Sequence, residues 1–210
     1  MDEQQSRIRI SDVGRSLFER RYTNGSSGNI SVRLDDGFLI TPTNSSLGRL
    51  DPAEISKVDF DGKHLGGKPP SKEAFLHLCM FRQRPAEGAV VHLHSTWSVA
   101  VSCLADLDPE DVMPAITPYY VMRVGRLPLI EYFPPGDRDL AKAVEAKASE
   151  AHSLLLANHG PIVAGKSLDA AVNAIEELEE TARLFMILKG LPTRYLSEEQ
   201  CDALRQRFPS

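Results

Sequence analysis

The chain has 210 residues, of which 42% are hydrophobic and 25% are charged, and this composition is typical of one globular domain spanning residues 1–210. Its formal net charge of −5 argues against a nucleic-acid partner, because phosphate backbones select strongly basic surfaces. No apolar run approaches the roughly 20 residues that cross a membrane, and the polar start MDEQQSRIRI does not resemble a signal peptide. Three widely spaced cysteines without a CxxC pair are typical of reduced thiols, so we expect a cytoplasmic protein.

The first half of the chain alternates helical and strand-like patterns. Apolar residues at helical spacing predict a helix over 7–22, and alternating residues around an Asp-Gly turn predict a hairpin within 29–41. A short helix start, a strand and a second Asp-Gly turn follow in 51–62. The Pro-Ser opening of 69–85 predicts a helix that Pro85 ends, with Glu73 in its first turn.

The second half continues this alternation. The segment 88–95 predicts a strand, and the Pro-rich stretch 112–137 contains short β-like runs. Two apolar runs within 153–165 flank a tight turn at Asn158-His159-Gly160-Pro161. Further helices are predicted over 96–105, 137–151 (capped near Asp137) and 167–190 (ended by Gly190). Interspersed strands and helices without repeats predict a single mixed α/β domain.

The stretch VVHLHS places His92 and His94 two residues apart in the predicted strand. Residues i and i+2 of a strand point to the same face, so both imidazoles can converge on one ion about 2.0–2.1 Å away. Leu93 then points to the opposite face, into the core. Alone, the pair is also compatible with two ordinary surface or hydrogen-bonded histidines.

His159 strengthens the metal interpretation. It follows an apolar run and lies beside a Gly-Pro turn, where a side chain is exposed and well positioned. Three imidazoles without a fourth fixed ligand are typical of a catalytic zinc site, because one position stays open for water or substrate.

Polar loops surround these histidines in the sequence. Glu73 has an ordinary interpretation as an acid at a helix start, but near a metal it can act as base, acid or displaceable ligand. The stretch PSKE adds a hydroxyl, backbone N–H groups and a cation. Together with SSGN (26–29) and TPTNSS (41–46), it favours a phosphate-binding site, although each loop alone is more typical of a turn.

The ordered motifs SSGNIS, TPT, PSKE, VVHLHS and NHG resemble those of the class II aldolase/adducin family over about residues 8–190. The resemblance implies an αβα fold with a central, mostly antiparallel sheet flanked by helices. It also implies a divalent metal, usually zinc, with another transition metal possible, and a homotetramer whose sites lie at subunit interfaces.

By position in these motifs, His92, His94 and His159 resemble the family's metal ligands, and Glu73 resembles its catalytic acid/base, which also ligates the metal in the empty site. The positions that match those holding substrate phosphate are Gly28, Asn29, Thr43, Asn44 and Ser71. Tyr119, with Tyr120 as a substitute, resembles an aromatic residue that a neighbouring subunit contributes.

One departure separates the branches of the family. The sugar-phosphate aldolases typically have two serines where this chain has Ser71-Lys72, and PSKE, HLHSTWS, TPYYVMRVG and EELEETA resemble more closely the branch that decarboxylates 3-oxo-tetronate 4-phosphates. Lys72 is then a candidate for substrate carboxylate or phosphate, and Arg123 a weaker one for carboxylate.

Three alternatives remain. The first is an aldolase acting on fuculose or ribulose phosphate, and the second is a pentulose-phosphate 4-epimerase; both retain the histidines. The third is a non-catalytic adducin-like module, which is disfavoured because all three histidines and Glu73 are present.

Overall fold

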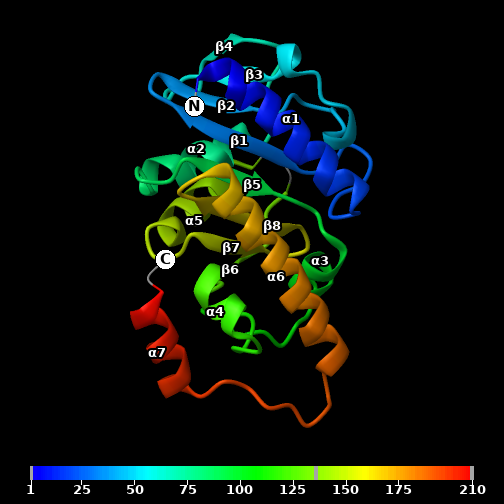
Figure 1. The fold of residues 1–210 in the computed structure, drawn as a ribbon, viewed down its shortest axis with the longest axis vertical. Coiled ribbons are helices and arrows are strands. Elements are labelled where there is room, and N and C mark those ends of the chain that lie inside the picture. The colour runs from blue at the N-terminus through cyan, green and yellow to red at the C-terminus, as the bar shows by residue number, and fades with distance from the viewer. Residues whose placement is uncertain (1, 135–136, 209–210) are drawn as a thin grey trace.

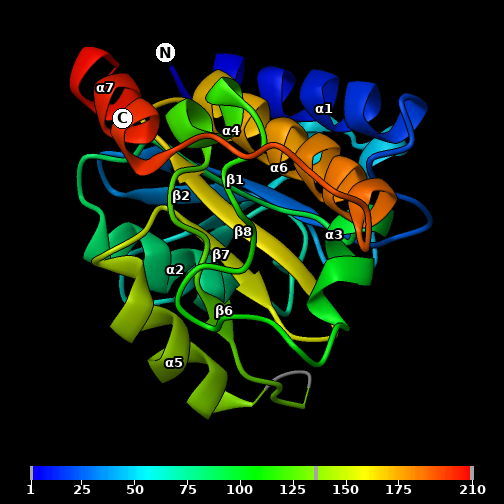
Figure 2. The same ribbon diagram turned by 90° about the horizontal axis from the view of Figure 1, so that it is seen from below.

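The computed structural model describes residues 2–134 and 137–208, which form one eight-stranded sheet with helices on both faces (Figures 1 and 2). The strands are β1 (Asn29–Leu34), β2 (Gly37–Ile40), β3 (Ser56–Val58), β4 (His64–Gly66), β5 (Ala89–His92), β6 (Leu129–Ile130), β7 (Ser153–Leu156) and β8 (Gly160–Gly165). Their order across the sheet is β4-β3-β2-β1-β5-β8-β7-β6.

The strand pairings confirm a mostly antiparallel sheet. Within the described chain, β6 and β7 pair in parallel and the other neighbouring strands pair antiparallel. In the centre, Val91 of β5 lies opposite Ile30 of β1 and Val163 of β8. The predicted hairpin is confirmed, with Leu34 paired to Gly37 across the turn.

The helices form the two outer layers of the predicted αβα architecture, as Figure 2 shows. They are α1 (Glu3–Glu19), α2 (Ala74–Gln83), α3 (Thr96–Ser102), α4 (Pro118–Arg123), α5 (Arg138–Ala148), α6 (Leu168–Leu188) and α7 (Glu198–Arg207). Helices α1, α3, α4 and α6 contribute to the core on one face of the sheet, and α2 and α5 to the core on the other. None of the helices in the described part is long and apolar enough to cross a membrane.

The central strand β5 shows how alternation divides these two cores. Val91 and Leu93 are fully buried against the α1 and α6 side, as predicted for the apolar face. Val90 is buried with the residues of α2 and α5. Because His92 shares the face of Val90, it points away from the α1–α6 core.

Three helices differ from what the sequence predicted. Helix α1 begins at Glu3 rather than residue 7, because Asp2 and Gln5 form a capping box. The Pro-rich stretch contains α4, since Thr117 caps it and Pro118 occupies its first turn, where a missing N–H costs nothing. Helix α7 was not predicted; it packs against α4 and buries Cys201.

Candidate metal centre and active site

The two histidines of VVHLHS lie together, although not on one strand as predicted. Strand β5 ends at His92, opposite Asn29 at the start of β1 and Ile162 of β8, because the next residue of β8 is Pro161, which has no N–H to donate. The Leu93 N–H still donates to the Pro161 carbonyl at 3.3 Å, so the extended path continues briefly beyond the strand. His94 then reaches the site from the loop before α3, with its Nε2 atom 2.9 Å from that of His92.

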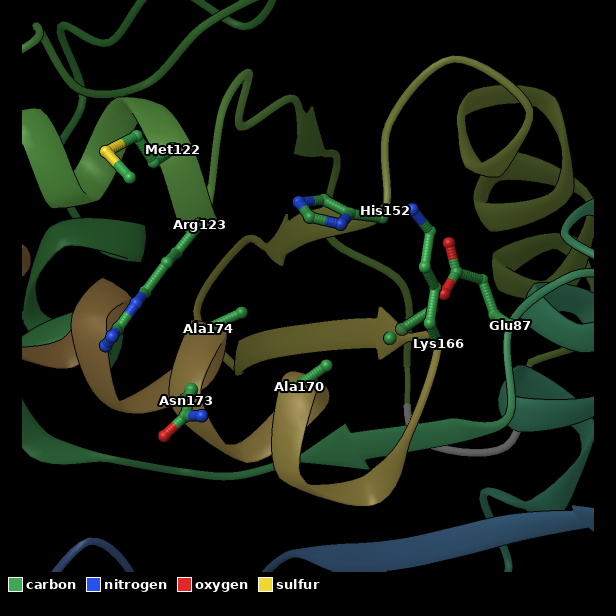
Figure 3. Close-up of a pocket in the computed structure, with 10 residues that line it drawn as sticks. Glu87, Met122, Arg123, His152, Lys166, Ala170, Asn173 and Ala174 are labelled. Atoms are coloured by element: carbon green, nitrogen blue, oxygen red, sulfur yellow. The ribbon is translucent and has the colours of Figure 1, made fainter. Parts of the chain in front are cut away.

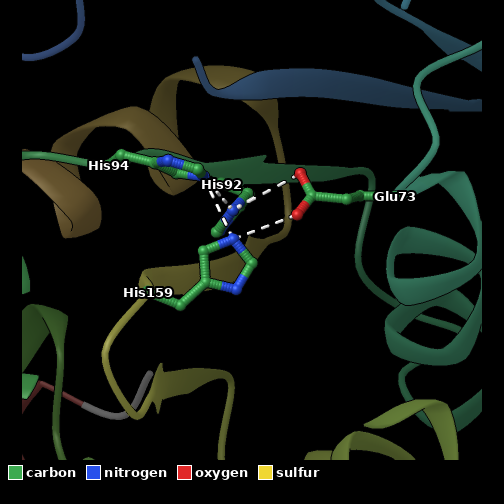
Figure 4. A group of neighbouring side chains, drawn as sticks. All are labelled: Glu73, His92, His94 and His159. Carbon is green, nitrogen blue, oxygen red and sulfur yellow. Dashed lines mark hydrogen bonds and ion pairs between the residues drawn. The ribbon is translucent and has the colours of Figure 1, made fainter. Parts of the chain in front are cut away.

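The turn between β7 and β8 presents the third histidine. Asn158 adopts a left-handed backbone conformation, with φ of 55°. Gly160 lies so close to β5 that a Cβ there would be 2.4 Å from the Leu93 carbonyl oxygen. With the turn packed this closely against β5, His159 Nε2 lies 3.1 Å from His94 Nε2 (Figure 4).

Glu73 completes the cluster from the opposite side, as Figure 4 shows. It lies at the N-cap position of α2, just before the first turn in which it was predicted. The reason is that residues 71–74 form a separate turn, in which the Ala74 N–H donates to the Ser71 carbonyl. Its Oε1 atom lies 3.1 Å from His159 Nε2, and its Oε2 atom lies 3.5 Å from His92 Nε2. The four candidate ligand atoms all lie within 4.8 Å of one another.

The protonation states of the cluster suit a cation. Burial alone would raise the pKa of Glu73, but the adjacent His92 and His159 and the Asn29 amide outweigh it and hold that pKa well below its usual range. Burial lowers the pKa of His92 to about 4 and also lowers the pKa of His94. Near neutral pH these groups therefore supply a carboxylate and neutral imidazoles, which are the forms that bind metal.

Backbone contacts fix the tautomer of His92. Its Nδ1 atom lies 2.8 Å from the Pro161 carbonyl oxygen, which can only accept, so Nδ1 carries the proton and donates it. Nε2 of the neutral ring then has a free lone pair directed at the cluster. Tetrahedral ligands about 2.0–2.1 Å from zinc lie about 3.3 Å apart, close to the observed spacing of the imidazole nitrogens. The residues therefore fit a divalent transition metal.

Sequence reasoning missed a buried network behind Glu73. Asn29 Nδ2 donates to Glu73 Oε2 at 2.7 Å, and the Asn29 carbonyl oxygen is hydrogen-bonded to Nε2 of the buried His77. His77 Nδ1 in turn lies 2.6 Å from the Ser31 hydroxyl. The spacing of Glu73 and His77, one helical turn apart, was the available signal, but it does not indicate what lies between the two side chains.

The predicted phosphate loops lie side by side next to the cluster. Pro42 pairs with Pro70, the Thr43 N–H donates to the Pro69 carbonyl, and the Ser71 N–H donates to the Thr41 carbonyl. These contacts bring together the segments that contain TPT and PSKE.

The individual phosphate candidates differ in their surroundings. Gly28 has a φ of 80°, and a Cβ there would be 3.1 Å from the His92 carbonyl oxygen, so it adjoins the cluster. The side chain of Asn29 is buried and bonded to Glu73, whereas Asn44 and Lys72 are exposed.

The tyrosine candidates separate clearly. Tyr119 is 56% exposed on α4, with the Arg123 guanidinium 5.2 Å from its ring centroid. Tyr120 is buried in the core of its own subunit, so of the two tyrosines Tyr119 is better placed to reach a neighbouring subunit.

Two cavities bear on the candidates. A cavity of about 630 Å³ adjoins His94 and His159. It is also lined by Asn158 of the NHG motif and by four residues that sequence reasoning did not single out, Thr96, Val99, Tyr132 and Phe133. Arg123 instead lines a separate cavity of about 270 Å³, where Figure 3 shows it among residues of α4, β8 and α6.

A family model described as Class II Aldolase and Adducin N-terminal domain matches residues 8–186. The chain belongs to this family. It is 50% identical over 204 residues to a 3-oxo-tetronate 4-phosphate decarboxylase of Escherichia coli strain K12, covering 97% of this chain and 96% of that protein.

A solved structure and an aldolase are also similar to this chain. The crystal structure of YgbL from Escherichia coli has a TM-score of 0.95 and 48% identity, covering 97% of this chain and 99% of that one. An L-fuculose phosphate aldolase of Methanococcus maripaludis is 36% identical over 179 residues, covering 85% of this chain and 95% of that protein. Members of this family with two different named reactions are therefore similar to the chain, and the decarboxylase is the more similar of the two.

Proposed function

We propose that this protein is a carboxy-lyase that converts a 3-oxo-tetronate 4-phosphate to dihydroxyacetone phosphate and CO2. The observation that carries the proposal is the convergence of Glu73, His92, His94 and His159 in a chain 50% identical to a named decarboxylase of that substrate. A divalent cation held by these residues would act as a Lewis acid toward negative charge that develops on the substrate oxygens.

The substrate's chemistry matches this cluster. Breaking the C1–C2 bond releases CO2 and leaves its electron pair conjugated with the C3 ketone, as an enediolate. Protonation at C2 then gives dihydroxyacetone phosphate. Glu73 is the proton donor in this scheme: it takes a proton from solvent and delivers it to C2.

The polar loops supply substrate binding in this proposal. Gly28, Asn29, Thr43, Asn44 and Ser71 are assigned to the phosphate, with Lys72 as a point charge for the phosphate or the carboxylate. Because the Asn29 side chain already bonds Glu73 and His77, only its remaining N–H groups are available to a phosphate.

The finer properties are also proposals. We infer zinc as the metal, although imidazole sites also accept other transition metals. We infer a cytoplasmic homotetramer in which Tyr119 reaches the site of a neighbouring subunit, and its exposed ring on α4 is compatible with that role. Metal analysis and light scattering of the purified protein test the metal and the tetramer.

A substrate assay tests the central proposal. Metal-loaded protein incubated with 3-oxo-tetronate 4-phosphate should release CO2 and dihydroxyacetone phosphate in equal amounts. Parallel incubations with fuculose 1-phosphate and ribulose 5-phosphate serve as controls. Cleavage or epimerisation of a control substrate without decarboxylation would establish the aldolase or epimerase alternative, which the 36% identity to an aldolase supports.

A further inference from the structure

We propose that His77 is a positioning residue that acts through Asn29 to orient the Glu73 carboxylate for proton transfer. The inference rests on the proposed function, because it concerns the group assigned there as the proton donor. It is carried by the hydrogen-bonded chain Ser31–His77–Asn29–Glu73, which connects β1 to the start of α2.

The direction of each hydrogen bond follows from the chemistry of the groups. The side-chain amide oxygen of Asn29 (Oδ1) can only accept, so His77 Nε2 donates to it. In the neutral ring Nδ1 then accepts from the Ser31 hydroxyl. Asn29 must therefore direct its NH2 group at Glu73 Oε2; the flipped amide would place its oxygen against the carboxylate and its NH2 against the Nε2–H.

Burial makes this arrangement rigid. Ser31 and His77 are fully buried and Asn29 is nearly so, so water does not offer alternative partners. Burial also lowers the pKa of His77 to about 3, which keeps the ring neutral and its donor and acceptor atoms distinct. The secondary structure brings these groups together. Asn29 and Ser31 point to the same face of β1, and Glu73, the N-cap of α2, lies one turn before His77.

The consequence is a division of labour between the two carboxylate oxygens. Oε2 accepts from Asn29, which fixes the orientation of the carboxylate and leaves Oε1 facing His159. In the protonation step an O–H bond of Glu73 breaks, the electron pair of the enediolate forms the C2–H bond, and the carboxylate is regenerated. Without His77 the side-chain oxygen of Asn29 loses its donor, so the amide is held from one side only and the carboxylate loses its fixed orientation.

A double-mutant cycle tests this coupling. His77→Leu should lower kcat about 10- to 100-fold, the range typical of residues that support a metal site, with little change in KM or bound metal. His77→Gln, which retains an N–H donor near the position of Nε2, should recover most of the activity. In an Asn29→Ala background, the His77→Leu change should lower kcat by no more than about twofold.

A matched control separates positioning from folding. His152→Leu removes a half-buried imidazole, which is bonded to the Val124 carbonyl, and should leave kcat unchanged. If His77→Leu and Asn29→Ala reduce kcat independently, or if His77→Gln gives no recovery, the coupling through Asn29 is excluded.

A measurement without substrate keeps this test distinct from that of the proposed function. Nitrogen-15 NMR of the metal-free protein should find His77 protonated on Nε2 and not on Nδ1, and His77→Leu should shift the Asn29 side-chain amide. A proton on Nδ1, or an unmoved amide, would overturn the inference even if the protein decarboxylates. If the protein fails to decarboxylate but both signals are as expected, the network stands and the proposed function fails.

Discussion

Two of the concave regions in the described part of the chain differ in how their titratable side chains are held. At the ends of β5 and β8, one carboxylate and three imidazoles from separate segments direct their polar atoms at one point. In the cavity between α4, β8 and α6, Arg123 and Lys166 are exposed, and Figure 3 shows their charged ends well apart. Convergence of ligand atoms, supported by buried hydrogen bonds, therefore identifies the candidate site better than a cavity lined by charged side chains.

The largest expected effect is the loss of the metal. His94→Ala removes the imidazole whose Nε2 lies within 3.1 Å of both other histidine nitrogens, so bound metal should fall below about a tenth of the wild-type amount. Decarboxylation should fall with it. Elemental analysis and the CO2 assay measure both, and Lys166→Ala in the other cavity should change neither. Retained metal and turnover in His94→Ala would exclude a metal mechanism at this site.

Removing the proton donor is the next largest change. Glu73→Gln preserves the shape of the side chain but cannot carry the proton, so kcat should fall about 10²- to 10⁴-fold while metal content stays near wild type. Steady-state kinetics and elemental analysis give the two values. Glu87→Gln, which changes the carboxyl group of the other cavity, is the matched control, and an equal loss of kcat in both variants would contradict the contrast between the two regions.

Backbone packing around His159 should have a smaller effect. In Gly160→Ala the new Cβ would lie 2.4 Å from the Leu93 carbonyl oxygen. The free energy of unfolding should therefore fall by more than the cost of a strained backbone alone, about 1–2 kcal/mol. Metal should also bind more weakly. Gly190→Ala also has a positive φ, of 81°, but meets nothing within 4 Å, so it should lose only that smaller amount. Urea titration of the metal-free proteins measures the difference. Equal stabilities of the Gly160→Ala and Gly190→Ala variants would show that the turn containing His159 is not closely packed against β5.

The smallest effect near neutral pH is a change in acid sensitivity. Burial lowers the pKa of His77 to about 3 from an ordinary value near 6.5. Between these two pH values the unfolded state binds a proton at this imidazole and the folded state does not. Below pH 6.5 this group therefore destabilises the fold by about 1.4 kcal/mol per pH unit as pH falls, and it has no such effect above. In metal-free His77→Gln the free energy of unfolding should fall less steeply between pH 6 and pH 4. An unchanged slope in urea titrations would show that His77 accepts a proton in the folded chain.

The local sequence was sufficient for most elements and for the identity of the cluster. The hairpin at Asp36-Gly37, the Asp137 cap of α5 and the stripe of α6 depend on contacts within a few residues, which a pattern records directly. Glu73 and the three histidines were singled out by their motifs and family resemblance, and the structure brings their ligand atoms together. Helix α4 was missed because proline-rich composition obscured its Thr117-Pro118 start.

The hydrogen bonds that support these groups depend on contacts between segments far apart in the chain. Asn29 and Glu73 are 44 residues apart, and Asn29 and His77 are 48 apart, so no local pattern indicates that the amide lies between the carboxylate and the imidazole. Their meeting depends on β1 lying beside β5 and on α2 packing against that side of the sheet. The sequence determined which chemical groups are present, whereas strand pairing and helix packing determined which atoms face one another, because hydrogen bonds require positions fixed to within a few tenths of an ångström.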